Sequence, residues 1–330
     1  MYRVTRDTKI SRSAVWLGVV GAIALLAAPT WASPNWMRKA IEIICYLVLA
    51  QMWNLMAGYG GMISVGQQAF VGVGGYALFL FAQHMHLNPF ASIILAGLVS
   101  TAIAAVTAPL VFRLRAGYFA VGTWVLADAL RIGASNLQIL GGGSGQSLTV
   151  MAQISPHVRQ LVTYWLACAI LIGASISINL FLRSKYGLGL TALRDSETAA
   201  ESQGVNVRAL KFQVYLLAAL GSGLVGALYY VNVLRIGATS AFDVSWVASV
   251  IFIVIVGGIG TLEGPIVGAS VYFFLRWALA DYGSWYWLVM GAVAIATVIF
   301  FPKGIWGGVQ QRTRIELLPL TRRLIQSHGK

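Results

Sequence analysis

Long apolar blocks separated by short polar segments make up most of this chain. The blocks recur from residue 14 to residue 301, and most approach the roughly 20 residues that cross a bilayer as a helix. Because lipid offers no hydrogen bonds to the backbone, continuous apolar blocks predict helices and not the alternating strands of a barrel. We therefore expect an all-α polytopic membrane protein of about ten transmembrane helices. The predicted helices cover 14–32, 40–56, 67–81, 90–112, 118–134, 164–182, 212–233, 246–256, 265–281 and 286–301.

Two alternatives to this count remain open at the level of sequence. A basic start followed by an apolar run that ends at Ala32 resembles a cleaved signal peptide. The run is long for a signal and has the length of a span, so we interpret it as an uncleaved first helix. An eight-helix chain, in which a glycine-rich segment re-enters the membrane, would also keep both termini on one side.

Two glycine-rich segments interrupt the apolar pattern, one in each half of the chain. The first, 54–77, reads NLMAGYGGMISVGQQAFVGVGGYA, and the second, 257–269, reads GGIGTLEGPIVGA. A glycine costs about 1 kcal/mol in a helix interior, so this density needs a reason. Close helix packing is one reason, and a broken helix whose backbone lines a pathway is another. We expect both, with a non-helical entry at 58–66 and a tightly packed helix after it.

The candidate pathway residues lie in these two interruptions. Gly-Gly-x-x-Ser at 60–64 matches Gly-Gly-x-x-Thr at 257–261, which suggests an internal repeat with a transport pathway between its halves. Amides and helix termini at such breaks suit a carboxylate, whereas in the alternative interpretation the glycines only pack helices. The candidates are Asn54, Gly58, Gly60, Gly61, Ser64, Gly66, Gln67 and Gln68 in the first segment, and Gly257, Gly258, Gly260, Thr261, Glu263, Gly264 and Pro265 in the second.

One strongly charged segment, 183–211, lies between two apolar blocks. Its middle, 191–203, predicts a short helix, with Asp195 and Glu197 near the start, where acids favour the helix dipole, and Gly204 as its C-cap. Glu197 and Glu201 are spaced to share one face of that helix. A short, charged, capped helix is typical of a docking surface, and a solvated linker is the alternative.

Composition and charge agree with a membrane protein and predict its orientation. The 330 residues are 58% hydrophobic and 10% charged, with a mean hydropathy of +0.77, where soluble domains carry about 25% charge. The net charge of +13 indicates orientation, not nucleic-acid binding, because 17 of the 23 lysines and arginines fall in 1–13, 113–115, 183–211 and 303–330. We expect a cytoplasmic N-terminal segment at 1–13, a transmembrane domain at 14–302 with the loop 183–211 in the cytoplasm, and a basic cytoplasmic tail at 303–330.

The sequence offers little for enzyme chemistry. Cys45 and Cys168 lie inside apolar blocks, where they serve as small core residues. The chain has no phosphate-binding loop of its own and no metal-ligand spacing, and Asp128 and Arg131 are placed to pair on one helix face. A stand-alone, ion-coupled transporter would need ionisable residues in mid-helix, for which Glu263 and Arg276 are the candidates.

The motifs, taken in order, resemble one known family. The segment 54–77 resembles the signature of the branched-chain amino-acid ABC importer permeases, the LivM/LivH family. The outer sequence GGGSG at 141–145, the cytoplasmic sequence RDSETAAESQGVNVRALK at 194–211 and the late segment IVGGIGTLEGPIVGA at 255–269 resemble further parts of that family. The order holds over about 54–301, and the length and extra first helix are more similar to LivM than to LivH.

The resemblance implies a non-enzymatic permease subunit in a bacterial inner membrane. Its partners would be a second, similar permease, two cytoplasmic ATPases that bind ATP and magnesium, and a periplasmic binding protein, so this chain would bind no cofactor or metal itself. Two departures from the family, Gln67-Gln68 and Glu263, leave related substrates such as urea, short amides or aromatic acids open. The residues implied in ATPase docking are Arg194, Glu197, Ala199, Ala200, Glu201 and Gly204.

Overall fold

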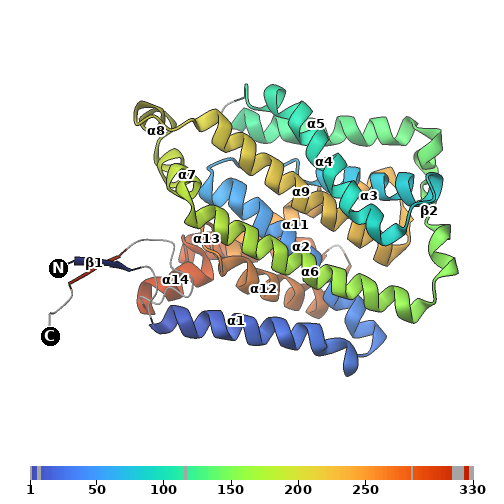
Figure 1. Ribbon diagram of the computed structural model, residues 1–330, viewed down its shortest axis with the longest axis horizontal. Coiled ribbons are helices and arrows are strands. Elements are labelled where there is room, and N and C mark those ends of the chain that lie inside the picture. The colour runs from blue at the N-terminus through green and yellow to red at the C-terminus, as the bar shows by residue number, and fades with distance from the viewer. Residues whose placement is uncertain (1, 6–8, 115–116, 284, 314–322, 327–330) are drawn as a thin grey trace.

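A bundle of long helices that lie side by side forms the body of the protein (Figure 1). The computed structural model describes residues 2–5, 9–114, 117–283, 285–313 and 323–326. The long helices are α1 (Lys9–Ala27), α2 (Pro34–Asn54), α3 (Gln68–Phe79), α4 (Pro89–Val111), α5 (Gly117–Asn136), α6 (Pro156–Arg183), α9 (Val207–Val233), α11 (Ser245–Gly257), α12 (Gly264–Ala278) and α13 (Trp285–Phe300). Shorter helices are α7 (Lys185–Asp195), α8 (Glu197–Ser202), α10 (Ala238–Ala241) and α14 (Gly304–Thr313).

The remaining elements are short turns and two small sheets. Single π-helical turns continue α2 (Leu55–Tyr59) and α3 (Leu80–His84). Strand β1 (Tyr2–Thr5) pairs antiparallel with β4 (Arg323–Gln326), and β2 (Gln146–Ser147) pairs antiparallel with β3 (Arg235–Ile236). The 3-10 turns are Ala28–Thr30, Gln138–Leu140, Gly142–Ser144, Thr149–Gln153 and Ala280–Tyr282.

Six helical segments in the described part of the chain are both long enough and apolar enough to cross a membrane. They are Pro34–Tyr59, Pro89–Val111, Pro156–Arg183, Val207–Val233, Ala238–Gly257 and Trp285–Thr313. The other four predicted spans are also helical but are not among these six. Helices α3 and α12 have 12 and 15 residues, and the described part of the first predicted span is a shorter apolar helix, Gly18–Thr30. The structure therefore confirms a helical membrane protein with six candidate spans, and the total of ten stays a prediction.

Segments predicted for one side of the membrane gather at one end of the bundle. Helices α7, α8 and α14 lie at the left of Figure 1, whereas β2 lies at the right. At the β2 end, Gln83 Nε2 donates to Thr149 Oγ1 at 2.6 Å, which ties the π-helical turn after α3 to the 3-10 turn Thr149–Gln153. We call the end with α7, α8 and α14 the inner end, and its location in the cytoplasm stays a prediction.

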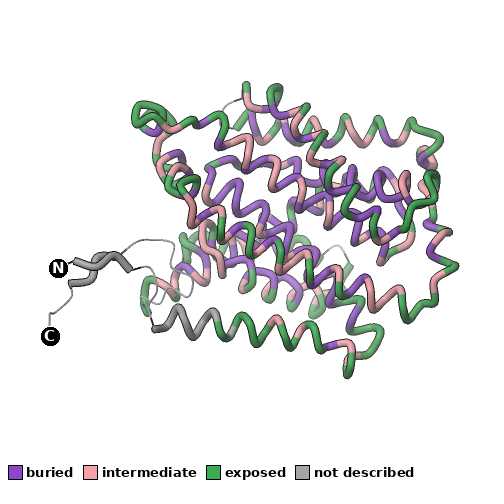
Figure 2. The backbone as a smooth tube through the Cα atoms, in the orientation of Figure 1, coloured by how far each residue is buried: buried purple, intermediate pink, exposed green. Residues whose placement is uncertain are grey.

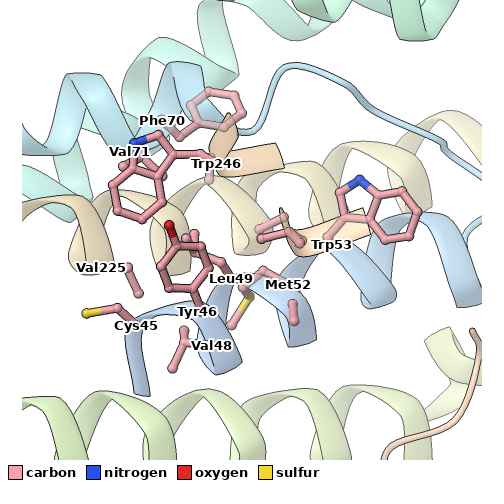
Figure 3. Close-up of a cluster of buried hydrophobic side chains, with 14 of the residues drawn as sticks. Cys45, Tyr46, Val48, Leu49, Met52, Trp53, Phe70, Val71, Val225 and Trp246 are labelled. Atoms are coloured by element: carbon pink, nitrogen blue, oxygen red, sulfur yellow. The ribbon is translucent and has the colours of Figure 1, made fainter. Parts of the chain in front are cut away.

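The core of the bundle is built on α2, α3 and α9, which are mostly buried (Figure 2). Aromatic side chains fill the space beside α2, where Tyr46 and Trp246 stack with ring centroids 5.1 Å apart (Figure 3). By contrast, α1 and α13 carry large exposed apolar side chains, such as Trp16, Ile23 and Phe300. Apolar outer faces of this kind suit contact with lipid.

Glycine provides the close approach between α3 and α9. A Cβ atom on Gly74 would lie 2.1 Å from the carbonyl oxygen of Gly223, and one on Gly226 would lie 2.0 Å from the carbonyl oxygen of Val71. Neither position has room for a side chain, because both obstacles are backbone. This part of the predicted glycine packing is confirmed.

The charged segment folds differently from the prediction. A single helix over 191–203 is wrong, because the chain forms α7 and α8 with a break at Ser196. Ser196 has extended backbone angles and its Oγ accepts a hydrogen bond from the Ala199 amide at 3.3 Å, so it caps α8. Asp195 therefore ends α7 and does not start a helix. Gly204 follows α8 with φ +80°, as its predicted role requires.

An ion pair joins α2 to α12 within the bundle. Arg276 Nη1 lies 2.8 Å from Glu42 Oε1, and the two side chains are 35% and 24% exposed. The guanidinium also lies over the rings of Tyr46 and Phe273, at 6.0 and 5.9 Å from their centroids. Arg276, one of the candidates for ion coupling, is thus engaged by an acid from the other half of the chain.

We expect Arg276→Met to destabilise the folded chain by about 2 kcal/mol. Glu42 would then keep a charge without its partner in mainly apolar surroundings, and its partial exposure limits the loss. The measurement is the thermal melting of the detergent-solubilised chain, followed as the fraction that remains monodisperse. The double variant Glu42→Arg with Arg276→Glu should recover part of the loss. Equal melting of parent and Arg276→Met would contradict this role for the pair.

Candidate functional site

The first glycine break connects α2 to α3 at the inner end. The π-helical turn carries the chain to Tyr59, so the predicted non-helical entry starts slightly later than expected, and Gly61 has φ +66°. Side chains then hold the extended stretch in place. Trp53 Nε1 donates to the Ser64 carbonyl oxygen at 2.8 Å, and the Val65 amide donates to Thr123 Oγ1 at 3.1 Å. The break is thus a fixed element and not a loose loop.

Gly66 and the two glutamines fix the start of α3. A Cβ atom on Gly66 would lie 2.1 Å from the Thr123 carbonyl oxygen, so only glycine fits against α5 there. Gln67 Nε2 donates to the Leu49 carbonyl oxygen at 3.1 Å and to Ser222 Oγ at 2.9 Å, which joins α3 to α2 and α9. Gln68 Nε2 donates to the Val65 carbonyl oxygen at 3.0 Å. These predicted pathway residues are buried and have structural partners in this conformation.

The second glycine break connects α11 to α12, also at the inner end. Gly258 and Gly260 have φ +134° and +75°, which other residues rarely adopt. Thr261 Oγ1 donates to the Gly258 carbonyl oxygen at 2.8 Å and accepts from the Gly264 amide at 3.0 Å, so it caps the start of α12. Glu263 is the residue before α12, and Pro265 occupies its first turn.

The side chain of Asn54, at the end of α2, hydrogen-bonds to the second break. Its Nδ2 donates to the Thr261 carbonyl oxygen at 2.7 Å, and its Oδ1 accepts from the Gly260 amide at 2.8 Å. Asn54 is 2% exposed, so both bonds are shielded from water. A Cβ atom on Gly58 would lie 2.2 Å from Asn54 Oδ1 and 2.6 Å from the Gly260 nitrogen. Glycine at 58 is therefore needed for this contact.

The charged segment 183–211 reaches the same place. Arg194, in the last turn of α7, donates from Nη1 to the Gly58 carbonyl oxygen at 3.2 Å. We call Asn54, Gly58, Arg194, Gly260 and Thr261 the three-way junction. The junction brings together residues from three separate segments of the sequence. Four of them are pathway candidates, and Arg194 is implied in ATPase docking.

Helix α8 presents one face outward at the inner end. Ala199 and Glu201 are exposed, whereas Ala200 is 1% exposed and faces the bundle. Glu197 Oε1 lies 2.6 Å from Lys211 Nζ, which fastens α8 to the start of α9. A groove of about 420 Å³ lies beside this helix, with Glu197, Glu201, Arg113 and Arg208 among its lining residues. Of the two alanines expected to admit a partner, only Ala199 is accessible.

Within the described residues, no group of three or more His, Cys, Asp or Glu side chains lies close enough to hold a metal ion. The side chains that gather at the junction are an amide, a hydroxyl and a guanidinium. Such groups bind and position other groups, and they include no base paired with a nucleophile. The site thus defines a class of protein: a polytopic helical membrane protein whose two helix breaks meet a charged segment at the inner end.

Comparison with known proteins gives the family. The chain belongs to the branched-chain amino acid transport system permease component family, which it matches over residues 37–298. The high-affinity branched-chain amino acid transport system permease proteins LivM of Salmonella typhimurium strain LT2 and Escherichia coli strain K12 are each 25% identical to it. Each alignment covers 91% of this chain and 74% of the relative.

A third relative matches a smaller part of the chain. The probable branched-chain amino acid transport permease protein LivM of Methanocaldococcus jannaschii is 24% identical over 58% of this chain and 56% of its own length. No solved structure matches the chain. The family assignment inferred from the glycine and charge motifs is confirmed, and the relatives are permease components and not enzymes.

Proposed function

We propose that this chain is a membrane-spanning permease subunit of an ABC importer. It would move branched-chain amino acids inward across a bacterial inner membrane, driven by ATP that partner subunits hydrolyse. The partners in this proposal are a second permease, two cytoplasmic ATPases and a periplasmic binding protein. Urea, short amides and aromatic acids remain the alternative substrates, because the two departures at Gln67-Gln68 and Glu263 affect candidate pathway residues.

The observation that carries this proposal is the contact from Arg194 to Gly58. An ATP-driven permease needs a mechanical connection between the surface where the ATPases dock and the segments that open and close the pathway. Helices α7 and α8 would provide the surface, and the three-way junction connects them to both glycine breaks. A movement of α7 would change the surroundings of both breaks at once. ATPases that contact α7 differently in the two conformations of the permease could therefore shift the balance between those conformations.

A stand-alone, ion-coupled transporter is the less favoured alternative. It requires ionisable groups that gain and lose protons or ions within the bundle. Arg276 is paired with Glu42, and Glu263 stands at a helix start beside the junction and not in mid-helix. The charged helix α8 also has no role in that mechanism.

Co-purification tests the docking surface. We expect the tagged chain, extracted gently from its native membranes, to bring two ATPases and a second permease, identified by mass spectrometry. The double variant Ala199→Trp with Glu201→Arg should reduce the ATPase yield at least about tenfold, because both side chains are exposed on α8 and both changes oppose docking. Ala200 is unsuitable for this test, since tryptophan there would disturb the fold.

The matched control is Ala278→Trp, which adds the same side chain at an exposed position at the end of α12. That variant should retain the ATPases. If the parent chain purifies without partners and still transports after reconstitution, the ABC proposal is wrong and the ion-coupled alternative gains support.

A further inference from the structure

An open cavity of about 510 Å³ adjoins the three-way junction at the inner end. It lies between the two glycine breaks, the end of α7 and helix α14, and Arg194, Gly58 and Gly260 of the junction form part of its wall. Its volume falls in the range of sites for small molecules. None of the functions considered so far uses this space.

The charged groups in the wall are all positive. Arg194 and Lys303 come from different elements of the chain, and the described lining residues include no acid. Gln310 and Gln311 add side-chain amides from α14. Together these groups favour an anion.

Glycine keeps the guanidinium accessible from the cavity. A Cβ atom on Gly260 would lie 3.0 Å from Arg194 Nη1, closer than ordinary contacts allow. The same nitrogen already donates to the Gly58 carbonyl oxygen, and a guanidinium carries five N–H donors in a planar fork. Arg194 can therefore keep its contact with the first break and still bind a carboxylate.

The rest of the wall indicates what kind of anion fits. Ala57, Ile259 and Pro302 provide apolar surface beside the two cations. The described lining residues include no aromatic side chain on which a nucleotide base could stack. A small molecule with one carboxylate and an aliphatic body matches this combination better than a nucleotide does.

We propose that this cavity is a carboxylate-binding site at the inner end of the pathway. The transported amino acid binds there by its carboxylate, between Arg194 and Lys303, before it is released to the cytoplasm. The identity of the ligand as the transported amino acid rests on the proposed function. Because Arg194 also donates to the first glycine break, a ligand bound in the cavity would change the contacts of the three-way junction.

Protection of an introduced thiol tests the site without any transport measurement. Cys45 and Cys168 are both buried, so Gln310→Cys in the full chain, reconstituted in lipid nanodiscs, provides an accessible thiol in the cavity wall. We expect L-leucine and 4-methyl-2-oxopentanoate, which share a carboxylate and an aliphatic body, to slow its labelling by N-ethylmaleimide about fivefold at saturation. L-leucinamide, which lacks the carboxylate, should not slow it.

Two charge variants made in the Gln310→Cys background supply the matched comparison. Lys303→Gln should raise the half-protecting concentration about tenfold, because it removes one charge-assisted hydrogen bond. Arg312→Gln removes a cation from the same helix that does not line the cavity and should leave protection unchanged. If the first thiol variant does not fold, Gln311→Cys replaces it.

The outcomes separate the parts of the proposal. Unchanged labelling with both carboxylates, or equal protection by L-leucinamide, overturns the carboxylate site. Protection by the oxo acid without protection by L-leucine overturns the transported amino acid as the ligand and points to another cytoplasmic carboxylate. The assay contains no ATPase and no binding protein, so its result is independent of the co-purification experiment.

Discussion

Asn54→Ala is expected to lower substrate uptake by at least about 100-fold while the chain still inserts and folds. The variant removes both hydrogen bonds that join the breaks and leaves the Gly260 amide and the Thr261 carbonyl group without their partner. A shielded polar group that loses its partner costs about 1–3 kcal/mol, and two such losses reach the roughly 2.7 kcal/mol that corresponds to a factor of 100. The second break should therefore leave its observed conformation.

Two measurements check this expectation. Uptake of radiolabelled leucine is compared at equal membrane abundance, and hydrogen exchange at residues 258–263 is followed in the purified chain, where it should become faster. Asn136→Ala is the matched control, because that amide donates to Ile132 of its own helix and is exposed. Uptake above half of the parent value in Asn54→Ala, with exchange unchanged, would show that the junction does not couple the two breaks.

Much of the helical framework follows from local sequence. The predicted helix 90–112 is α4, Pro89–Val111, because Asn88 and Pro89 supply a start and the apolar block ends at Arg113. The side chain of Asn88 accepts from the Phe90 amide at 2.9 Å, as an N-cap residue does. Asp128 and Arg131 pair at 2.7 Å as their spacing predicts. Signals of this kind involve neighbours along the chain, so a single sequence contains them.

Local rules also missed some boundaries and one break. Helix α6 starts at Pro156, where Ser155 accepts from the Val158 amide, so it begins eight residues before the predicted position. The residues in its first turns are too polar to continue the apolar block, although the helix includes them. At Ser196 the same capping chemistry divides a segment that the charge pattern presented as one helix.

The site itself depends on contacts that leave no periodic signal. Asn54 and Gly260 are 206 positions apart, and Glu42 and Arg276 are 234 apart. The repeat in glycine spacing pointed to both breaks, and the structure shows that they meet at one end. The glycine spacing could not indicate that the side chain of Asn54 joins the two breaks. Thr123, Trp53 and the cavity wall from α14 were missed for the same reason.

The two interpretations of the glycines apply to different residues. Gly74, Gly223 and Gly226 lie where α3 and α9 touch, so they serve packing. Gly58 and Gly260 lie at the junction, where the backbone of one break meets that of the other. Close packing in the first group keeps α3, and with it the first break, at a fixed distance from α9.

This division leads to a prediction of large effect on stability. Gly226→Ala should destabilise the chain by about 3 kcal/mol and lower its melting temperature by about 5 °C or more. The new Cβ atom would lie 2.0 Å from the Val71 carbonyl oxygen, and neither backbone can give way without separating α3 from α9. The close contact of Gly74 with Gly223 lies across the same interface and would loosen with it.

Gly173→Ala is the matched control, because it makes the same substitution within α6, where nothing lies within 4 Å of the added atom. That variant should melt at or above the parent temperature, since alanine favours a helix interior by about 1 kcal/mol over glycine. Size-exclusion melting of the three proteins in one detergent gives the comparison. Equal melting of Gly226→Ala and Gly173→Ala would mean that the helices tolerate separation, and the first break would then need another support to hold its position against Asn54.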